Sequence, residues 1–157
     1  MPTSSAPDRD DRALASGLAA VLPVLHRALD RGLALDFPHP RLPDAQLALL
    51  LLVGEGEGVT VRAASRALLM KPNNVSALVS RLVEQGLLDR RQDEGDRRVA
   101  HLHLTAEARS RIAEAQALKA GYVETALRAL TDGEAAALGS ALVALRSLTA
   151  SAQHPAG

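Results

Sequence analysis

A chain of 157 residues with 47% hydrophobic residues is long enough for one ordinary domain with its own apolar core. It has no cysteine, which excludes a disulfide framework and a thiolate metal site, and its single Phe and single Tyr argue against the aromatic platforms of single-strand binders. Lysine and arginine (18) balance aspartate and glutamate (18), so nucleic-acid binding would depend on where the charges lie.

The N-terminal third is predicted to be a polar arm, a long helix and a loop. Residues 1–11 are rich in Pro, Ser and Asp and predict a disordered arm rather than a signal peptide. Leucines recur at three- and four-residue spacing over 12–35, which predicts a helix that Pro23 kinks or splits. Prolines make 36–43 a loop. Because no unbroken run of about 18 apolar residues occurs, we expect no transmembrane helix and a cytoplasmic protein.

The middle of the chain predicts a helix-turn-helix followed by a hairpin. Residues 44–53 form a helix so apolar that it should be buried on most sides. Thr60 suits the N-cap of a helix over 61–70, and a second short helix runs from Pro72 to about Gln85. Gly86 is expected to end that helix, and 87–91 and 99–104 predict two strands joined by a charged turn.

Two further helices complete the chain. Thr105 can cap a helix from 106 to about 130, and Thr131 with Glu134 forms a capping box for a last helix to about 149. Leucines at 138, 142, 145 and 148 form a stripe on that last helix. Because leucine rows on the first and last helices would otherwise face water, we expect both helices to form a dimer interface.

The helix that begins at Pro72 has two different faces on a helical wheel. Val75, Leu78, Val79 and Leu82 share the inner face. The outer face is small and polar, which lets a backbone approach a DNA groove, and its candidate base and phosphate contacts are Lys71, Asn73, Asn74, Ser76, Ser80 and Arg81. The alternative is an ordinary surface helix whose polar side meets only water.

The turn of the hairpin carries the other candidate DNA contacts, Asp96, Arg97 and Arg98. A guanidinium suits the narrow minor groove, and Asp96 could direct Arg98 by pairing with it. Residues 59–104 hold eight basic and five acidic residues, an excess of three positive charges. The alternative is a solvated hairpin whose charges neutralise one another.

The central lobe resembles the MarR (multiple antibiotic resistance regulator) family. The similarity runs through the apolar helix at 46–53, Thr60-Val61, the opening Pro72, R-L-x-x-x-G-L-L at 81–88, D-x-R at 96–98 and L-T at 104–105. It departs from the family at Lys71, where a Ser cap is common, so either Asn73 caps the helix or the helix begins uncapped. It departs again at Ala77, where many members carry a polar or basic reader.

The resemblance implies a mainly α fold with a small β-hairpin wing. A winged helix-turn-helix DNA-binding lobe (44–105) would lie between N-terminal (12–43) and C-terminal (106–152) dimerisation segments, with 153–157 as a disordered tail. It also implies a homodimeric, ligand-responsive repressor of transcription that binds a pseudo-palindromic operator in duplex DNA. The helix from Pro72 would enter the major groove, and Arg98, supported by Asp96, would enter the minor groove.

Other functions leave weaker traces in the sequence. Phe37, His39 and Arg41 could line a cleft for a small-molecule effector, or their loop could simply turn the chain. His101 and His103 share a strand face without an obvious third ligand, so we expect no metal site. No G-x-S-x-G elbow, phosphate loop or H-E-x-x-H helix occurs, so we expect neither an enzyme nor a cofactor. The rival function is a winged-helix protein-interaction module that no longer reads DNA.

Overall fold

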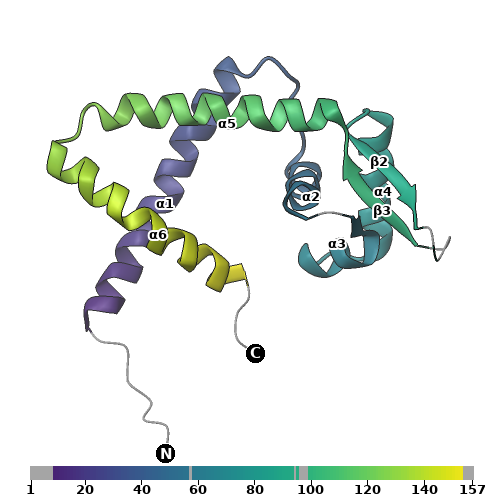
Figure 1. The fold of residues 1–157 in the computed structure, drawn as a ribbon, viewed down its shortest axis with the longest axis horizontal. Coiled ribbons are helices and arrows are strands. Elements are labelled where there is room, and N and C mark those ends of the chain that lie inside the picture. The colour runs from purple at the N-terminus through teal and green to yellow at the C-terminus, as the bar shows by residue number, and fades with distance from the viewer. Residues whose placement is uncertain (1–8, 57, 94, 96–98, 154–157) are drawn as a thin grey trace, which may run out of the picture. The chain divides into compact units, whose positions relative to one another are not determined.

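The computed structural model describes residues 9–56, 58–93, 95 and 99–153. Within them the predicted class, mainly α with a small β-hairpin wing, is confirmed (Figure 1). In chain order the elements are α1 (Arg9–Asp36), α2 (Asp44–Glu55), β1 (Val59–Thr60), α3 (Val61–Ala67), α4 (Pro72–Glu84), β2 (Leu88–Gln92), β3 (Ala100–Leu104), α5 (Ala106–Leu127) and α6 (Asp132–Gln153).

The chain divides into two compact units. The first, called the lobe, spans Leu33–Leu118. The second, called the terminal unit, comprises the described residues up to Gly32 and those from Lys119 onward. Every buried residue that the structure describes lies between Gln46 and Ala108, so the hydrophobic core belongs to the lobe.

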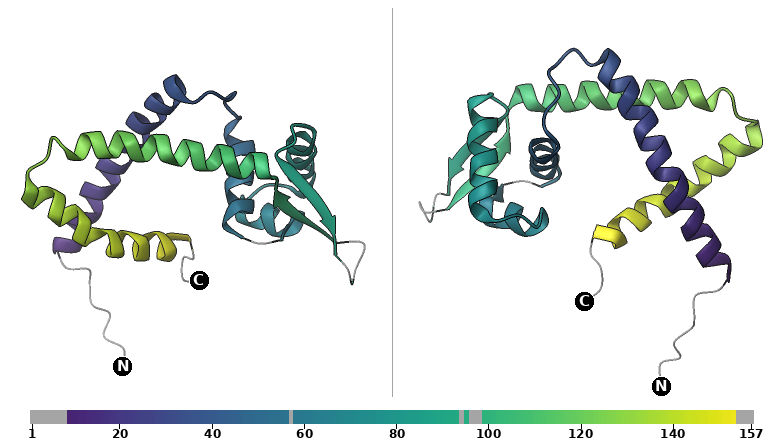
Figure 2. Two further views of the ribbon diagram at one scale, coloured as in Figure 1. Left: turned by 45° about the horizontal axis from the view of Figure 1, so that its top comes forward. Right: turned by 180° about the vertical axis from the view of Figure 1, so that it is seen from behind.

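The core of the lobe is aliphatic, as the scarcity of aromatic residues requires. α2, α4, the sheet and the turn between α4 and β2 contribute its largest fully buried side chains, Leu49, Val75, Val79, Leu82, Leu87, Leu88 and Leu102. The inner face expected for α4 therefore packs inward, with Leu78 partly buried against the same cluster. Figures 1 and 2 show α4 lying against the hairpin in all three views.

The sheet has three strands in the order β1-β3-β2, all antiparallel, where the sequence predicted only a two-stranded hairpin. β1 is two residues long and pairs Val59 with Leu102 and Thr60 with His101. β2 pairs Leu88 with Leu104 and continues to Gln92 opposite Ala100. β3 is thus the central strand, which explains why Leu102 has no exposed surface.

The capping interactions expected at the helix ends form hydrogen bonds in the structure. The Thr60 hydroxyl accepts from Ala63 N, and the Thr105 hydroxyl accepts from Ala108 N. At the end of α4, Gly86 has φ +70° and Leu87 N donates to Leu82 O at 2.8 Å, a Schellman closure. The Thr131–Glu134 capping box also forms, and the hydrogen bonds from the Thr131 amide and hydroxyl lower the pKa of Glu134.

Two helices differ from what the sequence predicted. α1 is one helix from Arg9 to Asp36, so of the two outcomes expected at Pro23, a kink or a split, the split does not occur. The other hydrogen bonds of a 28-residue helix offset the one donor that proline lacks. α2 is not buried on most sides, because the side chains of Leu47 and Leu51 are 42% and 41% exposed. α4 and β3 cover one face of α2 only. The arm predicted over 1–11 and the tail predicted over 153–157 lie mostly outside the described residues.

The helices of the terminal unit are more apolar than the search for an unbroken run indicated. Asp11–Asp36 and Asp132–Ala152 are each long and apolar enough to cross a membrane, by length and composition alone. None of either segment is buried in the chain taken by itself. A helix of a soluble protein that packs against another helix passes the same test.

Gly32 lies where α1 passes the Tyr122 ring of α5. A Cβ added at Gly32 would lie 2.8 Å from Tyr122 Cε2, too close for an ordinary contact. We expect Gly32→Leu to lower the free energy of unfolding by about 1–3 kcal/mol, because overpacking displaces the ring. Gly17→Leu in the same helix meets nothing within 4 Å and should not destabilise. Equal urea midpoints for the two variants would contradict this close approach.

Candidate nucleic-acid interface

The outer face of α4 is fully open to solvent. All six residues predicted on it, Lys71, Asn73, Asn74, Ser76, Ser80 and Arg81, are exposed. The Ser80 hydroxyl donates within the helix to Ser76 O at 3.1 Å, while Ala77 is exposed between them. The structure therefore brings the six candidates together on or beside one small, polar helix face.

The start of α4 settles how the helix begins. Lys71 occupies the N-cap position in an extended conformation and makes no side-chain cap, and Pro72 is the first helical residue. Of the two alternatives the sequence left open, the helix therefore begins uncapped. Pro72 has no N–H, and the Asn74 and Val75 amides both donate to Lys71 O. The positive dipole end of the helix nevertheless lies next to a lysine, which favours a negatively charged partner such as a phosphate.

The turn between α3 and α4 contains an unusual leucine. Leu69 has φ +52°, and its side chain is 94% exposed. A left-handed conformation costs a leucine about 1–2 kcal/mol, so the tight connection between the two helices requires this geometry against the residue's preference. The turn shortens α3, which ends at Ala67 instead of at Met70 as predicted.

Exposed cations lie on α3, at the two ends of α4 and on β2. Arg62 and Arg66 on α3, Lys71 and Arg81 at α4, and Arg90 and Arg91 on β2 are all exposed. Within the part of the chain that the structure describes, none of these six forms an ion pair, whereas Arg111 and Lys119 on α5 and Arg128 just after it each do. Exposed cations without partners on the same unit leave a positive surface for an anionic ligand.

The wing is described only at its base. β2 and β3 carry the chain to Gln92 and back from Ala100, and Asp93 N donates to Val99 O at 3.0 Å. The Asp93 carboxylate also accepts from Gly95 N at 2.8 Å. Asp96, Arg97 and Arg98 lie outside the described residues, so their roles in the minor groove stay predictions.

A histidine that the sequence analysis set aside holds the base of the wing. His101 Nδ1 lies 2.6 Å from the Gly58 carbonyl oxygen, and its Nε2 lies 3.0 Å from Asp93 Oδ2. These two acceptors raise the pKa of His101, the Gly58 carbonyl contributing most and the Asp93 carboxylate next. The spacing of these residues in the sequence does not predict the two contacts, because only the pairing of the strands brings Gly58 and Asp93 to the His101 ring.

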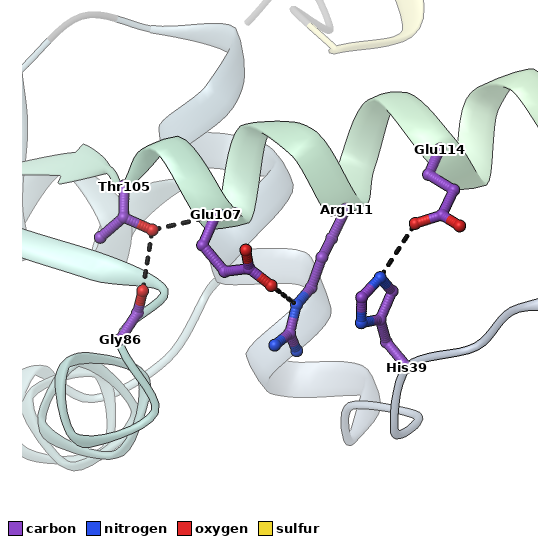
Figure 3. A network of polar contacts seen from close by, with 7 residues as sticks. His39, Gly86, Thr105, Glu107, Arg111 and Glu114 are labelled. Atoms are coloured by element: carbon purple, nitrogen blue, oxygen red, sulfur yellow. Dashed lines mark hydrogen bonds and ion pairs between the residues drawn. The ribbon is translucent and has the colours of Figure 1, made fainter.

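α5 fixes the far end of α4. The Thr105 hydroxyl, which caps α5, donates to Gly86 O at 2.8 Å, and Figure 3 shows it between the two segments. Further along α5 in the same view, Glu107 pairs with Arg111 at 2.6 Å. Arg111 lowers the pKa of Glu107 through this bond. The orientation of α4 is thus tied to the helix that continues into the terminal unit.

The candidate effector residues are brought together only in part. The rings of Phe37 and His39 meet edge to face, with centroids 5.0 Å apart. His39 Nε2 also lies 2.9 Å from Glu114 Oε2 on α5 (Figure 3), so this ring already has a partner. Arg41 is exposed. None of the three lines the cavity of about 290 Å³ between α2 and α5, which is bordered by Leu51, Gly54, Glu55, Leu104, Arg109, Ile112, Ala113 and Gln116.

Comparison with known proteins shows the family to which the sequence of the lobe is similar. Residues 42–99 match the sequence model of the MarR family. The lobe is a MarR family winged helix. A search of curated protein sequences returned no match.

Solved structures of transcriptional regulators and MarR family proteins share the fold of almost the whole chain. A MarR family regulator from Rhodococcus sp. RHA1 has a TM-score of 0.59 and 22% identity, over 96% of this chain and 99% of its own. A MarR family protein from Bacillus stearothermophilus has a TM-score of 0.69 and 22% identity, over 93% and 99%. A transcriptional regulator from Thermotoga maritima has a TM-score of 0.71 and 22% identity, over 87% and 94%. The similarity of fold therefore extends beyond the lobe to the terminal helices.

Proposed function

We propose that this protein is a homodimeric transcriptional repressor that binds a pseudo-palindromic operator in duplex DNA. The observation that carries the proposal is the outer face of α4, which is small, polar and exposed and has a cation at each end, Lys71 and Arg81, neither of which forms an ion pair with another described residue. α4 would enter the major groove with its N-terminal half, where asparagine, serine and arginine can contact base edges and phosphates. The wing arginines would contact the adjacent minor groove.

The test measures binding of the full chain to the DNA duplex that flanks its own gene. Fluorescence anisotropy gives the affinity at each salt concentration of a series. Log affinity should fall linearly with log salt, with a slope of about −0.9 per phosphate neutralised. A duplex of the same length and scrambled sequence should bind more weakly at every salt concentration. Affinity that depends on neither salt nor sequence would favour the rival function, a winged-helix dimer that docks a protein.

The terminal unit supports the dimer, because it has apolar surface and no core of its own. In α1 the side chains of Leu14, Val21, Leu22, Val24 and Leu25 are 47–64% exposed, and in α6 those of Leu138, Leu142, Val143 and Leu148 are 47–72% exposed. No residue of the terminal unit that the structure describes is buried. Large contiguous apolar surfaces mark association sites, and a second copy with the same helices is the partner we propose.

Charges placed on this surface should break the dimer. We expect Leu138→Glu with Leu142→Glu to convert a dimer into a monomer at micromolar concentration, because each carboxylate would be desolvated in the interface. Sedimentation velocity in detergent-free buffer measures the change. Ser140→Glu with Ser147→Glu is the matched control, since both serines lie on the opposite side of α6 and are exposed. A wild-type monomer, or a protein that stays in solution only with detergent, would contradict the dimer.

A ligand response is part of the same proposal. The exposed Arg41 could hold a carboxylate, but it does not line the cavity between α2 and α5. That cavity lies within the lobe that carries α4. An effector bound there would lower operator affinity by favouring a different orientation of α4. We propose that the protein acts in the cytoplasm, where its operator lies.

A further inference from the structure

Both hydrogen bonds to His101 form together only when its ring is doubly protonated. A backbone carbonyl and a carboxylate are both acceptors, and they lie at 2.6 Å from Nδ1 and 3.0 Å from Nε2. A neutral imidazole carries one N–H, so it can satisfy one of these acceptors and leaves the other facing a lone pair. The imidazolium donates to both.

The two bonds join segments that are distant in the chain. Gly58 precedes β1, and Asp93 follows β2 at the base of the wing. Asp93 in turn accepts from Gly95 N and donates its own amide to Val99 O. Gly58 has φ +68°, and a Cβ there would lie 3.2 Å from His101 Nδ1, so glycine permits the close approach of its carbonyl to the ring.

Other charged residues lie on β2 and on the helices packed against β3. Arg91 lies directly opposite His101 on β2 and shares its face of the sheet, where a cation opposes protonation. Asp89 lies opposite His103 on the same face. Elements packed against β3 also carry Asp44 and Glu55 on α2 and Arg62 and Arg66 on α3. Of all charged residues described, only Asp93 has a hydrogen bond or ion pair with the ring.

We infer that His101 is a positioning residue for the wing: protonated, it ties the Asp93–Gly95 end of the wing to the turn before β1. This inference rests on the proposed function only for its consequence on DNA. Because the pKa of His101 is raised above its ordinary value of 6.5, the link is complete below about 6.5 and is lost as pH rises through the raised pKa. The wing is thus held more firmly at mildly acidic than at alkaline pH.

The inference is tested on the full chain without DNA. Long-range ¹H–¹⁵N spectra should show protons on both ring nitrogens of His101 at pH 6. Hydrogen-exchange protection factors of the Asp93 and Gly95 amides should fall about tenfold between pH 6 and pH 9, the size of one charge-assisted hydrogen bond. His103→Ala, which removes the neighbouring histidine of the same strand face, should leave both readouts unchanged.

Asp93→Asn separates positioning from simple packing. The asparagine oxygen can still accept from Gly95 N, while its NH₂ group donates to a neutral His101 Nε2 and leaves Nδ1–H for Gly58. Wing protection in this variant should therefore persist at pH 9, and the pH dependence should disappear. Protection that falls with pH equally in wild type and Asp93→Asn, or a wild-type His101 that titrates at 6.5 or below, would overturn the inference.

The DNA measurement is kept separate. For a protein that binds the operator, the ratio of its affinity at pH 6 to its affinity at pH 9 is measured for wild type and for Asp93→Asn. The wild-type ratio should be about tenfold larger than the ratio for the variant. A protein that shows the exchange behaviour and binds no duplex would refute the proposed function and leave the role of His101 in the wing intact.

Discussion

Ser76→Glu with Ser80→Glu should weaken binding to the operator duplex by about 100-fold or more. Both serines lie on the outer face of α4 and are exposed, so the two carboxylates would meet phosphates and base edges in the major groove. Like charges placed against each other in an interface cost several kcal/mol, and each 1.4 kcal/mol is about tenfold in affinity. Anisotropy titration at a fixed salt concentration gives the number.

Two serines on α6 provide the matched control for this variant. Ser140→Glu with Ser147→Glu makes the same chemical change and the same change in net charge, and Ser140 and Ser147 donate to Ala136 O and Val143 O much as Ser80 donates to Ser76 O. This control should bind DNA within about threefold of wild type, because distant exposed charges act only through the screened net field. Thermal unfolding of both variants should agree with wild type to about 0.5 kcal/mol. Equal losses of affinity would remove α4 from the interface.

Leu102→Ala should lower the free energy of unfolding by about 2–5 kcal/mol, the range for a leucine deleted from a packed core. Leu102 has no exposed surface and lies on the central strand, opposite Val59 of β1 and Arg90 of β2. The cavity would therefore loosen both neighbouring strands and the helices packed on them. Urea denaturation followed by circular dichroism measures the loss.

Leu69→Ala is the comparison for this core substitution. It deletes the same atoms from a side chain that is 94% exposed, and alanine has no easier access than leucine to the left-handed conformation at φ +52°. Its stability should therefore stay within about 0.5 kcal/mol of wild type. A similar loss in both variants would mean that the lobe is not organised around the core that Leu102 shares with Val75, Val79 and Leu82.

Local chemistry made most helix boundaries readable from the sequence. A threonine N-cap at 60, a capping box at 131–134 and a left-handed glycine at 86 each act within a few residues, so pattern and structure agree there. The two faces of α4 follow from helical periodicity alone. The candidate DNA contacts on α4 are consequently placed as predicted, on or beside one exposed face.

What the sequence missed depends on contacts between distant residues. β1 is only two residues long and exists because Val59 and Thr60 reach β3. The His101 link joins residues 43 and 8 positions apart, so no short motif announces it. For α2 the sequence predicted more burial than the structure has. Leu47 and Leu51 are apolar and were expected in the core, but no other element of the lobe covers the face of α2 on which they are exposed.

Site-directed cleavage of DNA tests the central claim most directly. The chain has no cysteine, so Ser76→Cys offers a single attachment point for an iron chelate on the outer face of α4. A dimer that inserts two α4 helices should cut the operator duplex at two positions about one turn apart, ~34–36 Å. The same label on Ser140→Cys in α6 should give no localised cuts. Uniform cleavage from Ser76→Cys, or the same pattern from both labels, would contradict a protein that reads DNA with α4.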